Sequence, residues 1–153
     1  MTFLIKKISV IYTSVMFIGF IPFASGTWAS IFAALIFFLL FSSQHILIQL
    51  VIILLCSIVA VWCSNQVIQT KTDDPHSIVM DEVIGMWITC LFIPSDSLFW
   101  LFTAFIFFRV LDILKPWPIK NLEKLPGGAG IVSDDIVAGI IGTLLLLLIR
   151  AIL

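Results

Sequence analysis

Charged residues are scarce in this chain of 153 residues, and their scarcity argues against a water-soluble fold. Asp, Glu, Lys and Arg make up 11% of the sequence and apolar residues 61%, with a mean hydropathy of +1.23. Soluble domains usually have about 25% charged and about 45–50% apolar residues. Because one core of this size cannot bury so much apolar surface, we expect a single integral-membrane domain spanning residues 1–153.

The cysteines and basic residues are also not arranged as in cysteine-ligated metal sites or nucleic-acid interfaces. The three cysteines, Cys56, Cys63 and Cys90, lie in apolar runs without metal-type spacing, so buried packing is their expected role. No basic patch with interleaved aromatic residues occurs, and nucleic acid is therefore not an expected partner. No low-complexity tract or linker divides the chain.

Long apolar runs dominate what is present, and they predict helices. A spanning helix needs about 20 apolar residues, or somewhat fewer where flanking side chains reach the interface. The sequence therefore predicts an all-α, polytopic membrane bundle with about five spanning helices and an additional N-terminal helix. The predicted segments are residues 8–20, 28–41, 46–64, 78–93, 98–114 and 136–153.

Lys and Arg residues gather at one set of helix ends. The connections 42–45 and 94–97 hold none, and only Arg150 lies toward that side. Short loops rich in Lys and Arg stay cytoplasmic, so the other loops are expected to face the cytoplasm. Residues 8–20 then form a re-entrant or interfacial helix; a full span with an external N-terminus and a signal peptide are the alternatives. The residues on the cytoplasmic side are Lys6, Lys7, Lys71, Arg109, Lys115, Lys120 and Lys124.

Two short stretches are near copies of each other, IVMDEVIG at 78–85 and IVSDDIVAG at 131–139. Each places two adjacent carboxylates, Asp81 with Glu82 and Asp134 with Asp135, at the start of a predicted helix. Such acids can simply be first-turn residues that interact favourably with the helix dipole. An ionised carboxylate beside hydrocarbon needs compensation, however, so two matched pairs favour a bound cation.

Small residues follow both acidic pairs. Gly85 follows the first pair, and Ala138, Gly139 and Gly142 follow the second. Small residues let membrane helices approach closely, so a crossing here brings the two pairs together. Oxygen ligands without a Cys or His cluster suit Mg²⁺ rather than zinc.

A cationic group ends the fifth predicted helix. Arg109, Asp112 and Lys115 are spaced i, i+3 and i+6 before Pro116. Arg109 and Asp112 are one turn apart and either pair with each other or contribute to a site. In the second case Lys115, with Lys120, supplies donors to a phosphate group.

Three further features remain as candidates. Thr27 and Ser30 of the stretch GTWAS stand at a predicted helix start, where Thr27 is either an N-cap or part of an anion site. Gly128 belongs to a glycine-rich run that can contact phosphate. His76 is either solvated or has a role in proton transfer or metal binding.

Taken together, GTWAS at 26–30, DPHSIVMDEVIGMWIT at 74–89, FRVLDILKPWPI at 108–119 and GGAGIVSDDIVAGI at 127–140 resemble the phosphatidylglycerophosphatase A family in order and spacing. The resemblance implies a Mg²⁺-dependent, membrane-embedded phosphatase. Such an enzyme converts phosphatidylglycerophosphate to phosphatidylglycerol on the cytoplasmic face of a bacterial inner membrane.

On this basis each candidate residue receives an expected role. We expect catalytic roles for Asp81, Asp134, Lys115 and His76, and metal ligands among Asp81, Glu82, Asp112, Asp134 and Asp135. The expected substrate contacts are Thr27, Ser30, Arg109, Lys115, Lys120 and Gly128. The attacking group is either a metal-activated water or one of the carboxylates, which would form a phospho-enzyme.

Other phosphatase signatures are missing. The chain has no Cys-x5-Arg loop, no Asp-x-Asp-x-Thr motif, and only His45 and His76 as histidines. The alternative function is an ion- or proton-coupled membrane carrier, because paired carboxylates in repeated segments also occur in transporters.

Overall fold

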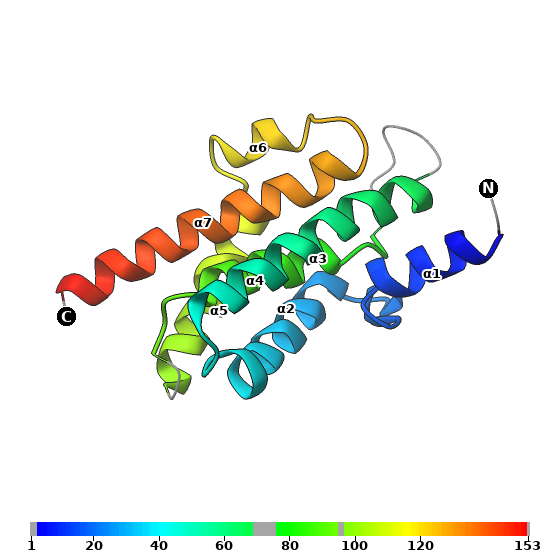
Figure 1. Cartoon of the computed structure of the whole chain (residues 1–153). Coiled ribbons are helices and arrows are strands. Elements are labelled where there is room, and N and C mark those ends of the chain that lie inside the picture. The colour runs from blue at the N-terminus through cyan, green and yellow to red at the C-terminus, as the bar shows by residue number, and fades with distance from the viewer. Residues whose placement is uncertain (1–2, 69–75, 95–96, 153) are drawn as a thin grey trace.

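The computed structural model describes residues 3–68, 76–94 and 97–152, and the regular structure within them is entirely helical (Figure 1). The all-α prediction is therefore confirmed for this part of the chain. Its α-helices are α1 (Phe3–Thr13), α2 (Ser25–Ile36), α3 (Ile46–Val67), α4 (Met80–Cys90), α5 (Leu98–Leu114), α6 (Ile119–Leu122) and α7 (Gly128–Ile152). A short 3-10 helix, η1 (Ile18–Phe20), precedes α2, and a π-helical turn, η2 (Phe37–Phe41), extends it.

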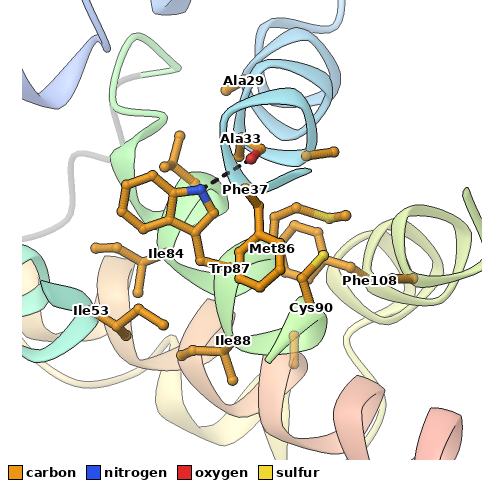
Figure 2. Packing of buried hydrophobic residues seen from close by; sticks show 14 of the residues in the cluster. Ala29, Ala33, Phe37, Ile53, Ile84, Met86, Trp87, Ile88, Cys90 and Phe108 are labelled. Carbon is orange, nitrogen blue, oxygen red and sulfur yellow. Dashed lines mark hydrogen bonds between the residues drawn. The ribbon is translucent and has the colours of Figure 1, made fainter. Parts of the chain in front are cut away.

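Helix α4 lies at the centre of the bundle, packed mainly between α7 and α2. All of its 11 residues except Glu82 are buried, as expected of a helix that is apolar around its circumference. Its indole at Trp87 donates from Nε1 to the Ala33 carbonyl oxygen of α2 at 3.1 Å (Figure 2). This bond satisfies a buried polar group and fixes α4 against α2.

Glycines allow α4 and α7 to cross with their backbones in contact. A Cβ atom at Gly85 would lie 2.7 Å from the Asp135 carbonyl oxygen, and one at Gly139 would lie 2.5 Å from the Gly85 carbonyl oxygen. Neither position has room for a side chain. The close approach predicted from the small residues is therefore confirmed, and it brings the two acidic stretches side by side.

Within the described residues two helices, α3 with 22 residues and α7 with 25, are long and apolar enough to cross a membrane, fewer than the five expected. The discrepancy arises from length: α4 has 11 residues, and α5 and the α2–η2 unit are shorter than 18. At about 1.5 Å per residue, α4 spans only about half of a hydrocarbon core of about 30 Å. The outer faces of α3 and α5, and of α7 from Ile140 onward, nevertheless expose apolar side chains.

The N-terminal segment is not one helix over residues 8–20. Helix α1 ends at Thr13, and Val15, Met16 and Phe17 follow with positive φ angles before η1 begins. Helix α1 turns Ser9 and Thr13 inward and exposes Phe3 and other apolar residues. A break after Thr13 excludes a single straight span through these residues.

Two predicted helix starts were wrong. Helix α7 begins at Gly128 rather than at 136, because the Asn65 side chain of α3 accepts a hydrogen bond from the Gly128 amide at 2.9 Å. Helix α2 begins at Ser25, with Ala24 as its N-cap residue, so Thr27 is not the cap.

Candidate metal and phosphate site

One cavity of about 1090 Å³ lies at the end of the bundle where α2, α4 and α7 begin and α5 ends. It collects all the carboxylates of the described residues together with three cations. The carboxylates are Asp81, Glu82, Asp112, Glu123, Asp134 and Asp135, and the cations are Arg109, Lys115 and Lys124. With every group ionised, the negative charges exceed the positive ones, so the cavity favours added positive charge.

Three of these acids form a compact cluster. Asp81 and Glu82 stand in the first turn of α4, and Asp135 lies one to two turns inside α7. One oxygen from each of the three lies within 4.8 Å of the others. A Cβ atom at Gly26 of α2 would collide with Glu82 Oε1, so glycine is needed there to leave space for the carboxylate.

The cluster fits the ligand chemistry of Mg²⁺. Asp81 Oδ1, Glu82 Oε2, Asp134 Oδ1 and Asp135 Oδ2 are all buried without a hydrogen-bond partner among the described residues. A buried acceptor without a partner is costly, and several anionic ones together cost more. Hard oxygen atoms in such an arrangement suit a small divalent cation.

Arg109 and Asp112 form an ion pair on α5. Arg109 Nη1 donates to Asp112 Oδ2 at 2.6 Å and to Ser30 Oγ at 3.4 Å. Ser30 is buried and donates to the Gly26 carbonyl oxygen at 2.7 Å, and it does not line the cavity. Ser30 thus holds Arg109 in place instead of facing the cavity.

Lys115 connects the end of α5 to the acids of α7. It ends the helix with a left-handed backbone, and its Nζ donates to Asp134 Oδ2 at 2.7 Å and to Glu123 Oε1 at 3.2 Å. Burial alone would lower the pKa of Lys115, but the hydrogen bonds and attraction to Asp134 and Glu123 outweigh it and raise the pKa above its usual value. Lys115 therefore stays a fixed positive charge beside the cavity.

The remaining predicted residues divide into two groups. His76 lines the cavity, where its carbonyl oxygen accepts a hydrogen bond from Ser25 Oγ at 3.0 Å. Thr27, Lys120 and Gly128 do not line it. Gly128 instead donates its amide to Asn65, and Lys120 is exposed on α6.

Two charged residues of the cavity were missed by the sequence reading. Glu123 and Lys124 follow α6, which folds back so that both line the cavity. The spacing of Glu123 from Lys115 gives no local pattern, because a Pro-Trp-Pro turn separates them.

Comparison with known proteins gives consistent matches. The family model for phosphatidylglycerophosphatase A matches residues 11–150. A protein named phosphatidylglycerophosphatase A from Escherichia coli is 39% identical over 124 residues, covering 80% of this chain and 72% of that protein. The protein of the same name from Haemophilus influenzae is 37% identical over 134 residues, covering 86% and 82%.

A third relative carries a different name. A protein from Bacteroides thetaiotaomicron, provisionally named phosphatidylinositol-3-phosphatase, is 33% identical over 138 residues, covering 86% of this chain and 87% of its own. No solved structure matches the chain.

Proposed function

Because the chain belongs to the phosphatidylglycerophosphatase A family, and is thus a phosphatase, we propose that it hydrolyses phosphatidylglycerophosphate to phosphatidylglycerol and phosphate. The observation that carries this proposal is the cavity that holds both cations and buried carboxylates whose oxygens lack partners among the described residues. Such a cavity can hold a metal ion and a phosphate group next to each other.

The proposed cofactor is Mg²⁺, with Asp81, Glu82 and Asp135 as its ligands. These three acids offer oxygens close enough together for one ion. A bound Mg²⁺ would offset their charge and polarise a phosphoryl oxygen. Asp112 and Asp134 are already engaged by Arg109 and Lys115, so we assign them to the margin of the metal site.

The cations and Asp134 supply the rest of the chemistry. Lys115 and Arg109 stabilise the negative charge of the phosphoryl group. Electrostatic stabilisation of this kind is a main source of catalysis in phosphoryl transfer. Lys115 donates a hydrogen bond to Asp134 Oδ2. The other oxygen of the same carboxylate, Asp134 Oδ1, is left to accept a proton from the attacking water. The new bond joins the water oxygen to phosphorus, and the bond to the lipid alcohol breaks. The released alkoxide takes up a proton from solvent and becomes the free alcohol of the product.

The proposed location is the inner membrane of a bacterium, with several crossings and the cavity on the cytoplasmic side. The apolar outer faces of α3, α5 and α7 support contact with lipid, and the Lys and Arg distribution supports the orientation. In a cysteine-free background, a membrane-impermeant thiol reagent added to intact cells should label Ser43→Cys and leave Lys120→Cys unmodified. Labelling of Lys120→Cys alone would show that the protein has the opposite orientation in the membrane.

A second substrate follows from the Bacteroides relative. Phosphatidylinositol 3-phosphate is also a phosphomonoester on a lipid headgroup, and its larger ring would have to fit the same cavity. The carrier alternative has no comparable support, because every carboxylate of the described residues lines one cavity at one end of the bundle.

The experiment compares both lipids with one purified protein. Phosphate release is measured from phosphatidylglycerophosphate and from phosphatidylinositol 3-phosphate in matched mixed micelles, with EDTA and then with Mg²⁺ restored. We expect release from the first lipid, loss in EDTA and recovery with Mg²⁺. Preference for the inositol lipid would change the substrate, and full activity after metal stripping would reject the metal site.

A further inference from the structure

The cavity has a second wall that differs chemically from the charged one. Gly19, Phe20, Ile21 and Pro22 line it together with the acids of α4 and α7. These residues come from η1 and the turn after it, a segment with no assigned role. One cavity therefore has a charged part and an apolar part.

The apolar segment is also exposed on its outer side. Phe20 is 54% and Phe23 81% exposed, and Met16 and Phe17 are exposed beside them. A cluster of exposed aromatic and aliphatic residues marks a surface that contacts another apolar phase. Lys6 and Lys7 of the preceding helix α1 line a small hollow together with Phe17 and add positive charge there, as is common where a protein meets anionic lipid headgroups.

This segment is held in place despite an unfavourable backbone. Val15, Met16, Phe17 and Ala24 all have positive φ angles, which are costly for residues other than glycine. The Val79 amide donates to the Thr13 carbonyl oxygen at 2.9 Å just before the segment.

Gly19 fixes the segment at its centre. A Cβ atom at Gly19 would collide with the Ser77 carbonyl oxygen, in the stretch that leads into α4. Thus the apolar wall packs directly against the backbone that leads to Asp81 and Glu82.

We infer that residues 19–22 form the subsite for the glycerol backbone and the first acyl carbons of the lipid whose phosphate occupies the charged part of the cavity. This inference rests on the proposed function. A lipid phosphate can reach the acids only while its acyl chains remain in hydrocarbon, so the cavity must be apolar between the two. The wall at Phe20, Ile21 and Pro22 meets that requirement and is continuous with the exposed apolar surface.

The first test is kinetic and uses a matched pair of variants. Phe20→Ala removes a half-exposed ring from the wall, and Phe102→Ala removes a 66% exposed ring from α5, which does not line the cavity. Phe20→Ala should lower kcat/KM for dioleoyl phosphatidylglycerophosphate by about 3–15-fold, the factor for losing part of the burial of a phenyl ring. Phe102→Ala should leave it unchanged. For the deacylated headgroup, the two variants should behave like the wild type.

The second test measures position without turnover. A phosphonate analogue of phosphatidylglycerophosphate, with a diazirine near the carboxyl end of one acyl chain, is photolysed with the protein in micelles. Adducts should form within residues 17–23 and decrease when unlabelled phosphonate lipid competes, whereas adducts on the outer face of α5 should not decrease.

The outcomes separate this inference from the function it rests on. Competed adducts that lie elsewhere, or an equal loss by Phe20→Ala on acylated and deacylated substrates, would reject the subsite. Wild-type protein that releases no phosphate from any lipid would reject the proposed function, and the cross-linking result would still report the position of the chain.

Discussion

The two acidic pairs have nearly the same sequence, yet they occupy different positions in their helices. Asp81 and Glu82 lie in the first turn of α4, where free backbone amides and the helix dipole stabilise negative charge. Asp134 lies six positions after Gly128, the first residue of α7, and the dipole effect is lost beyond the first turn. Simple helix stabilisation can therefore explain the pair on α4 but not the pair on α7.

The α7 pair depends on charges from elsewhere in the fold. Each of the two acids has one buried oxygen without a partner among the described residues, but Asp134 also accepts a hydrogen bond from Lys115 at the end of α5. Asp135 thus gives the stronger reason to infer a cation, although the α4 pair matches it in sequence. The helix dipole explains an acid only in the first turn of its helix, so the position of the acid decides whether another cause is needed.

Neutralising one acid from each pair gives the largest expected effect. Glu82→Gln and Asp135→Asn should each reduce phosphate release by more than about 1,000-fold, the effect of removing an essential charge from the site. In metal-free protein, Asp135→Asn should also raise the unfolding temperature, because it replaces a buried carboxylate that has an oxygen without a partner among the described residues. Thermal unfolding in detergent with EDTA measures this. If Asp135→Asn stays active, the two pairs are not one site.

The next largest loss of activity is expected from removing the Lys115 side chain. Lys115→Ala should lower kcat/KM by about 10–1,000-fold, because it removes a charge-assisted contact and frees Asp134. The effect should be non-additive with Asp134→Asn, its hydrogen-bond partner. Steady-state kinetics of the two single variants and the double variant gives the coupling. Strict additivity would show that Lys115 acts independently of the α7 pair.

Separating α4 from α7 tests whether the crossing holds the pairs together. Gly139→Ala places a methyl group against the Gly85 backbone, and we expect a loss of about 1–3 kcal/mol in stability with reduced activity. Gly142→Ala meets Thr89 Cγ2 at 3.0 Å, part of a side chain that can shift, and should cost less. Thermal unfolding of both variants checks the order. Equal losses of stability in the two variants would show that Gly139 is no more important for the crossing than Gly142.

The smallest effect is expected outside the cavity. Lys120→Ala should change kcat/KM by less than about twofold, because Lys120 is exposed on α6 and does not line the site. The matched measurement is Lys124→Ala, since Lys124 lines the cavity. A large loss from Lys120→Ala alone would place the phosphate beyond the Pro-Trp-Pro turn.

Local signals were sufficient to predict some elements to the residue. Helix α5 runs from Leu98 to Leu114 as expected, because Ser97 caps its start and Lys115 with Pro116 ends it. The small residues near Gly85 and Gly139 also predicted the crossing that brings the acids together. These features depend on neighbours in sequence or on residue size.

Other features depend on distant contacts that no local pattern contains. The start of α7 at Gly128 depends on Asn65, which is 63 residues away. The glycine run was therefore not recognised as the start of α7, and the second acidic pair was placed at a helix start. Glu123 was missed for the same reason, since only the fold of α6 brings it to Lys115.

The Asn65 side chain at the start of α7 has a consequence for ligand competition. Aspartate would be at least as good a cap, because its charge matches the positive end of the helix. Gly127, next to the capped amide, lines the same cavity as the carboxylates. An anionic cap would repel an incoming phosphate, whereas the neutral amide leaves the electrostatic potential of the helix start available to it. The Asn65 amide thus caps α7 without adding negative charge next to the cavity.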